Sequence, residues 1–237
     1  MFNIDPMGLV LMAVIVGLGM LGQGYLSRTF NKYGQIHNSK DLTGAEVARD
    51  ILDANGLQNV RVEATPGHLT DHYDPMSKTV RLSEPNYASP SLSALAVAAH
   101  EVGHAIQDAK MYAPLVARAK LAMPLGAVAN LGNMALMAGA MMIMMNFGGG
   151  LGRTFLIVGI IGLAAVLLFH LVTLPVEFDA SNRALAILEH NGYLSREENQ
   201  GARKVLNAAA MTYVIAAVAS ALQLLYYLNM LRGGSDE

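Results

Sequence analysis

The sequence predicts a mainly α-helical membrane protein with four transmembrane helices and a small α+β domain. Hydrophobic residues make up 53% of the 237 residues and charged residues only 14%, which is too apolar for one soluble domain of this size. The apolar residues are concentrated in four segments, each long enough to cross a bilayer. The polar stretches between these segments have the periodicity of helices and strands.

The four apolar segments divide the chain into membrane and aqueous regions. Only Arg153, near the start of the third segment, carries a formal charge within them. The segments are residues 7–26, 121–147, 151–174 and 205–231. The expected regions are an anchor (1–26), a cytoplasmic α+β domain (27–120), a transmembrane hairpin (121–174), a second cytoplasmic stretch (175–204) and a last helix with its tail (205–237).

Charge distribution gives the orientation. Only a glycine turn, residues 148–150, joins the second and third spans, so residues 27–120 and 175–204 share one membrane face and can build one site. These two stretches hold 14 of the 16 Lys and Arg residues, which predicts that this face is cytoplasmic and that both termini lie outside. Basic residues follow the first span and none precedes it, so it is expected to be an uncleaved anchor.

The first cytoplasmic stretch is expected to begin with a helix and a sheet. Thr43 and Glu46 have the spacing of a capping box, which predicts an amphipathic helix ending near Ala54. The period then changes to two: residues 60–64 alternate between apolar and polar, and residues 79–82 follow after a turn. These runs predict a small antiparallel sheet.

The next helix carries the most informative motif, His-Glu-Val-Gly-His at residues 100–104. A Ser-Pro pair at residues 89–90 predicts the start of this helix. His100 and His104, four residues apart, share one helix face and can bind one zinc ion. Glu101 then lies beside the open metal position, where a carboxylate acts as general base toward a zinc-activated water. The alternative is a core helix that carries two polar residues.

A catalytic zinc usually takes three protein ligands plus water, so a third ligand is required. Glu177, in the second cytoplasmic stretch, is the expected ligand. Pro175 is expected to end the third span and begin another helix, with Glu177 in its first turn near the membrane surface. The alternative is that Glu177 is a carboxylate stabilised by the helix dipole. The chain has no cysteine, which excludes thiolate ligands and disulfides.

Other polar residues are candidates for supporting roles. Asp108, four residues after His104, is either a hydrogen-bond partner of a ligating imidazole or a solvated aspartate. Residues 69–73 are expected to form an edge strand that pairs with an extended substrate. The donor that stabilises the oxyanion stays open among His72, Tyr73, His190 and Tyr193.

Six motifs carry a resemblance to a known family. They are LTGAEVA (42–48), LTDHYDP (69–75), KTVRLS (78–83), AAHEVGHA (98–105), LPVEFDAS (174–181) and LNAAA (206–210). In these motifs the chain resembles the YugP-type membrane zinc metallopeptidases of bacteria, over nearly its whole length. The resemblance implies a zinc-dependent peptidase in the bacterial cell membrane, with a zincin-like domain in which His100 and His104 bind zinc and Glu101 is the base.

The plan is also similar to the HtpX-type and CAAX-prenyl membrane peptidases, in which a Glu-x-x-x-Asp motif after the membrane hairpin supplies the glutamate ligand. Glu177 matches that glutamate, but Ser181 stands at the aspartate position. A serine can hydrogen-bond a neighbouring ligand but brings no charge. Asp179 and Asp108 are the candidates to compensate.

The predicted function is therefore zinc-dependent hydrolysis of peptide bonds near the cytoplasmic membrane surface. The expected partners are polypeptide substrates, above all membrane proteins or their cytoplasmic segments, and the lipid bilayer, but no nucleic acid. The glycine-rich first span permits an oligomer or a membrane partner. Two other functions stay open. One is a zinc-containing scaffold that does not cleave peptides, and the other is a channel with a polar path through Asn130, Asn133, His170 and Gln223.

Overall fold

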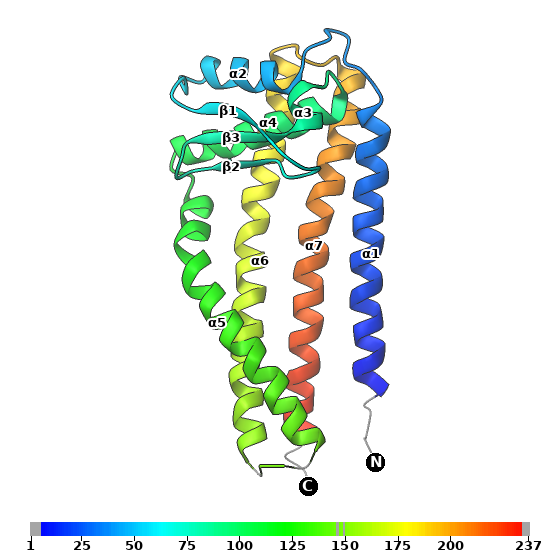
Figure 1. The fold of residues 1–237 in the computed structure, drawn as a ribbon, viewed down its shortest axis with the longest axis vertical. Coiled ribbons are helices and arrows are strands. Elements are labelled where there is room, and N and C mark those ends of the chain that lie inside the picture. Colours follow the sequence, from blue (N-terminus) through cyan, green and yellow to red (C-terminus); the bar gives the residue numbers. More distant parts are fainter. Residues whose placement is uncertain (1–5, 146, 149, 234–237) are drawn as a thin grey trace. The chain divides into compact units, whose positions relative to one another are not determined.

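The computed structural model describes residues 6–145, 147–148 and 150–233. Their order along the chain is α1 (Pro6–Gly34), α2 (Gly44–Ala54), β1 (Arg61–Thr65), β2 (His72–Asp74), β3 (Thr79–Ser83), α3 (Glu84–Ala88), α4 (Leu92–Ala109), α5 (Ala113–Met144), α6 (Leu151–His190) and α7 (Arg196–Gly233) (Figure 1). The chain forms two units. The first contains residues 1–21, 117–173 and 213–237, and the second contains residues 22–116 and 174–212.

The first unit is built from the apolar parts of the long helices. Four helices, α1, α5, α6 and α7, are long and apolar enough to cross a membrane, which confirms the predicted number of spans within the described residues. In α5 and α6 the backbones approach closely at Gly132 and Gly162, where neither position has room for a Cβ atom. Leucines of these two helices, among them Leu136 and Leu156, form a cluster with side chains of α7.

All four spanning helices extend beyond the apolar segments that predicted them at one end or at both. The largest difference is in α6, which continues without a break from Leu151 to His190 and contains Pro175 in its interior. The prediction that Pro175 ends one helix and starts another is therefore wrong. Val176, Ala180 and Ala184 are fully buried on the C-terminal side of the proline. Their packing explains why the helix continues despite the one backbone hydrogen bond that proline cannot donate.

The second unit starts with the predicted amphipathic helix. The α2 capping box is present: the backbone N–H of Thr43 donates to Glu46 Oε2 (2.8 Å), and the backbone N–H of Glu46 donates to Thr43 Oγ1 (3.3 Å). The apolar stripe of α2, which includes Val47 and Ile51, is completely buried. Helix propensity, capping and amphipathic burial all favour a helix at these residues, so the sequence was sufficient to predict α2.

The sheet differs from the prediction. Its strand order is β1-β3-β2, with β2 antiparallel to β3 but β1 parallel to β3. The prediction of an antiparallel sheet is therefore wrong for the β1–β3 pair. Alternation of apolar residues specifies which face a strand buries, but it does not specify the direction of its neighbour. The expected edge strand lies at an edge, as the shorter β2.

The central element of the second unit is α4, which contacts α2, α3, β2 and β3. It begins at Leu92, with Ser91 as the N-cap, so the start predicted at residues 89–90 is two residues early. Gly103 allows α4 and α6 to pack closely, since a Cβ atom there would lie 2.9 Å from the carbonyl oxygen of Ala180. This close contact brings the α4 motif next to the C-terminal half of α6.

Candidate metal centre

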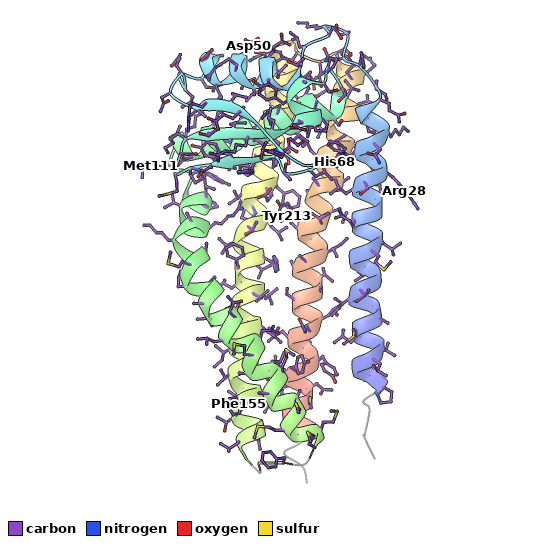
Figure 2. All side chains as sticks on the ribbon, in the orientation of Figure 1. Arg28, Asp50, His68, Met111, Phe155 and Tyr213 are labelled. Carbon is purple, nitrogen blue, oxygen red and sulfur yellow. The ribbon has the colours of Figure 1, made fainter. Side chains whose placement is uncertain are left out.

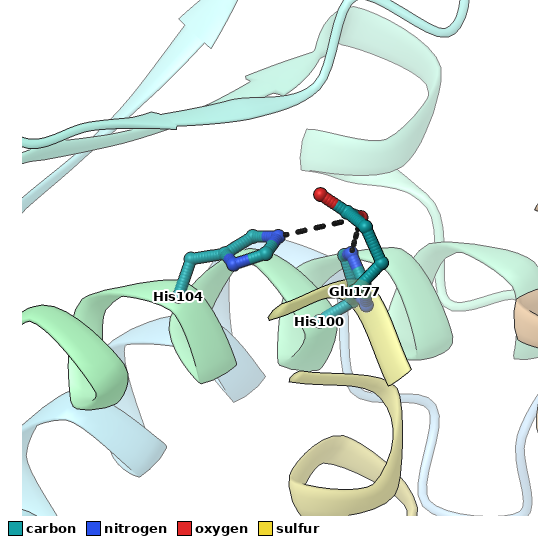
Figure 3. A group of neighbouring side chains, drawn as sticks. All are labelled: His100, His104 and Glu177. Carbon is teal, nitrogen blue, oxygen red and sulfur yellow. Dashed lines mark ion pairs between the residues drawn. The ribbon is translucent and has the colours of Figure 1, made fainter. Parts of the chain in front are cut away.

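Two helices bring the three predicted ligands together (Figure 3). His100 Nε2 lies 3.4 Å and His104 Nε2 lies 3.7 Å from Glu177 Oε2. All three ligand atoms lie within 4.8 Å of one another. Tetrahedral zinc, with bonds of about 2.0–2.1 Å to nitrogen and oxygen, places its ligand atoms about 3.3 Å apart. The donor set therefore suits one zinc ion, the two distances to Glu177 are close to this value, and a fourth position is left open.

The orientation of His104 is fixed by Gln107, which is completely buried. The Gln107 amide nitrogen donates to the carbonyl oxygen of Val176 and to Asp179 Oδ2, both at 2.8 Å. Its amide oxygen lies 2.9 Å from His104 Nδ1. Because this oxygen can only accept, Nδ1 must carry the proton, and the lone pair of Nε2 is then free to bind a metal.

Ser181 is the hydrogen-bond partner of His100 Nδ1, as Gln107 is of His104 Nδ1. Its hydroxyl oxygen lies 3.2 Å from His100 Nδ1, so the hydroxyl can accept the Nδ1 proton and direct Nε2 toward Glu177. The residue that departs from the Glu-x-x-x-Asp pattern thus still contacts a ligand. The contact carries no charge of its own.

Asp179 supplies a carboxylate behind His104. It accepts from Gln107 and from Arg183, whose Nε lies 2.5 Å from Asp179 Oδ2. Arg183 also lies over the ring of Tyr112, 5.8 Å from its centroid. The sequence offered Asp179 as one of two candidates, with Asp108, but it gave no sign of the glutamine that connects Asp179 to His104.

Asp108 is engaged elsewhere. It accepts from the hydroxyl of Tyr73 and from Lys78 Nζ, both at 2.6 Å. The partner of His104 is Gln107, three residues further along the same helix face. Sequence reasoning missed Gln107 because a carboxylate is the more familiar partner of a ligating histidine. The spacing of three residues between His104 and Gln107, which places both on one helix face, was the signal that could have identified this partner.

Glu101 is buried beside the ligands, with 8% of its surface exposed. Burial raises its pKa above the usual carboxyl range, while His100 and His104 act in the opposite direction. Among the described residues no hydrogen bond to the Glu101 carboxylate is formed. The group is thus available to exchange a proton with a water molecule at the open metal position.

The candidates for oxyanion stabilisation separate clearly. His190 lies at the end of α6, 13 residues after Glu177 and therefore about 20 Å away along the helix axis. Tyr193 follows it and lies near Asp50.

The other two candidates are neighbours on β2. His72 pairs with Arg81 across the strands, whereas Tyr73 pairs with the buried Val80. Adjacent strand residues point to opposite faces, so Tyr73 faces α4 and His72 faces away from it.

A substitution of Gln107 tests its role as a positioning residue. Gln107→Leu is expected to weaken zinc binding by about 10- to 100-fold, because it removes the acceptor of the His104 Nδ1 proton. Zinc affinity measured by chelator competition checks this, together with thermal unfolding of the zinc-free chain. The matched control is Gln58→Leu, at an exposed position. Unchanged zinc affinity in Gln107→Leu would show that Gln107 only packs the two helices.

Two comparisons with known proteins agree with this geometry. A family described as "Putative neutral zinc metallopeptidase" matches residues 8–232, which include the three candidate ligands and Glu101. The chain is 42% identical over 222 residues to the "Putative membrane protease YugP" of Bacillus subtilis (strain 168), covering 94% of this chain and 95% of that protein. No solved structure matches the chain.

Proposed function

The chain belongs to the "putative neutral zinc metallopeptidase" family, and from this membership and the site geometry we propose that it is a membrane-integral zinc endopeptidase. His100, His104 and Glu177 hold one zinc ion, and Glu101 is the general base. The observation that carries the proposal is the convergence of two imidazoles and one carboxylate within 4.8 Å, with both imidazole Nδ1 atoms hydrogen-bonded. Three protein ligands with one open position are typical of catalytic zinc.

The reaction follows from the positions of these side chains. When bound, zinc polarises the peptide carbonyl and lowers the pKa of its water to about 7. Glu101 accepts the proton of the attacking water and then donates it to the amide nitrogen as the C–N bond breaks. Gln107 and Ser181 keep the two imidazoles in the orientation that binds metal. Tyr73 faces α4 and stays neutral because burial and Asp108 raise its pKa, but its hydroxyl donates to Asp108 and would have to leave that bond to stabilise the oxyanion.

The sheet edge supports a polypeptide as substrate. β2 is an edge strand and it contacts α4, the helix that carries the motif. An extended polypeptide pairs with such an edge through backbone hydrogen bonds, which gives affinity without a fixed sequence. We propose that the substrate binds along β2.

The four spans and the charge distribution support a site near the cytoplasmic membrane surface. Glu177 follows the last residue of the third apolar segment, Leu174, by three positions in the sequence. Membrane proteins and their cytoplasmic segments are the polypeptides that reach such a position. We therefore propose these as the substrate class, with the positive-inside rule as the basis for the cytoplasmic side.

A non-catalytic zinc scaffold is the competing function. A scaffold needs the three ligands but has no use for a buried glutamate beside them. Leaving Glu101 without a hydrogen-bond partner in the described residues costs stability, and such costs are concentrated at functional sites. Glu101 therefore favours the peptidase over the scaffold.

The proposal is tested by metal removal. The detergent-purified chain is expected to cleave an unfolded model polypeptide, to stop when zinc is removed by a chelator, and to recover when zinc but not magnesium is returned. Mass spectrometry of the products identifies the cleaved bonds. Cleavage that persists after zinc has been removed would contradict the proposed mechanism.

A further inference from the structure

A second site is suggested by a basic cavity between α1 and α7, within the second unit. The cavity has a volume of about 270 Å³. It is lined by Tyr25, Arg28, Thr29, Lys32, Tyr33 and Lys204. Three of these six side chains are cationic and none is acidic. The cavity shares no lining residue with the metal centre; Arg28, one of its cations, is labelled on α1 in Figure 2.

These cations are not neutralised by the protein. In the part of the chain that the structure describes, Arg28 and Lys204 make no hydrogen bond or ion pair, and Lys32 makes only a contact over the ring of Tyr33. All three are exposed. Four other arginines of this unit are paired with carboxylates in the described residues, as Arg49 is with Asp53 at 2.7 Å. Three like charges around one cavity repel one another, and a bound anion would relieve that repulsion.

The sequence places all three cations at the boundary between apolar and polar segments. Arg28 follows the last residue of the first apolar segment, Leu26, by two positions. Lys204 directly precedes Val205, where the last apolar segment starts. Basic residues and tyrosines at such boundaries lie at the depth of lipid headgroups, and a basic pocket between membrane helices is suited to an anionic headgroup.

We propose that this cavity binds the phosphate of an anionic phospholipid headgroup. The phosphate is held between Arg28 and Lys32, which lie one turn apart on α1, and Lys204 on α7. The bound lipid thereby connects the end of the first span to the start of the last one. A free phosphate has the same charge, but the position of the cations next to two apolar segments favours the lipid.

Native mass spectrometry of the full chain in neutral detergent tests the proposal. Wild type is expected to retain phosphatidylglycerol in preference to phosphatidylcholine with the same acyl chains. The triple variant Arg28→Gln, Lys32→Gln, Lys204→Gln is expected to bind phosphatidylglycerol about 100-fold more weakly, at about fivefold per charge. The control triple Lys40→Gln, Lys110→Gln, Arg196→Gln removes the same charge from exposed positions outside the cavity and is expected to bind like wild type.

Two further measurements make the result decisive. Both triple variants should retain the zinc content and the circular dichroism spectrum of wild type; if the cavity triple is unfolded, the single variant Lys204→Gln replaces it, with an expected fivefold loss. Excess inorganic phosphate should leave the lipid bound. Release of the lipid by phosphate, unchanged binding in the cavity variant, or an equal loss in the control triple would each overturn the proposal.

Discussion

Glu177→Ala is expected to abolish stoichiometric zinc binding and, with it, all peptide cleavage. Glu177 is the ligand that α6 contributes to the proposed metal centre, and its carboxylate lies within 3.7 Å of both imidazole Nε2 atoms. Removal of a residue that only supports a ligand typically costs about 10- to 100-fold in metal affinity, so the loss of a ligand should cost more than about 100-fold. Zinc content after dialysis, measured per chain, checks this result.

The control separates ligand loss from misfolding. Glu197→Ala removes a glutamate from an exposed position in the first turn of α7 and should retain zinc and activity. Circular dichroism of Glu177→Ala should match that of the zinc-free wild type. A folded Glu177→Ala chain that holds one zinc as tightly as wild type would exclude Glu177 as the third ligand.

Glu101→Gln is expected to keep the zinc and to lose cleavage. The amide has nearly the same volume as the carboxylate but cannot accept the proton of the attacking water. General acid–base catalysis contributes about 10²- to 10⁴-fold, and the turnover number should fall by a factor in that range. Single-turnover cleavage rates and zinc content, determined on the same preparation, provide the measurement.

Glu197→Gln is the matched control, since it makes the same chemical change at an exposed position. Glu101→Gln prepared in parallel also reports any contaminating protease. Should Glu101→Gln hold zinc and cleave at the wild-type rate, Glu101 is not the base. Loss of zinc in this variant would instead assign Glu101 a structural role at the metal centre.

The parts of the fold that the sequence predicts correctly depend on local signals. The four spans follow from the length of their apolar segments, and α2 follows from its capping box. His100 and His104 share a helix face through their spacing alone. Glu177 required more, because the need for a third ligand, the hairpin topology and the family resemblance together connected it to His104 and His100, 73 and 77 positions earlier. The structure brings these three together through the close packing at Gly103.

The parts that the sequence did not predict are set by tertiary contacts. Gln107 reads as an ordinary polar helix residue until α6 packs against it and supplies the Val176 carbonyl and Asp179. The parallel pairing of β1 and β3 depends on the path of the intervening chain. Pro175 marks a helix boundary by its local chemistry, but the buried side chains that follow it continue the helix. Each case is a local preference overridden by packing.

The most direct test of the zinc peptidase is the metal content of the wild-type chain, purified from membranes and measured on the sample used for the cleavage assay. The structure predicts one zinc per chain, with cleavage of the unfolded polypeptide that rises and falls in proportion to the zinc retained. A wild-type chain that lacks stoichiometric zinc, or one whose cleavage does not depend on it, would contradict the metal centre of His100, His104 and Glu177 as a catalytic site.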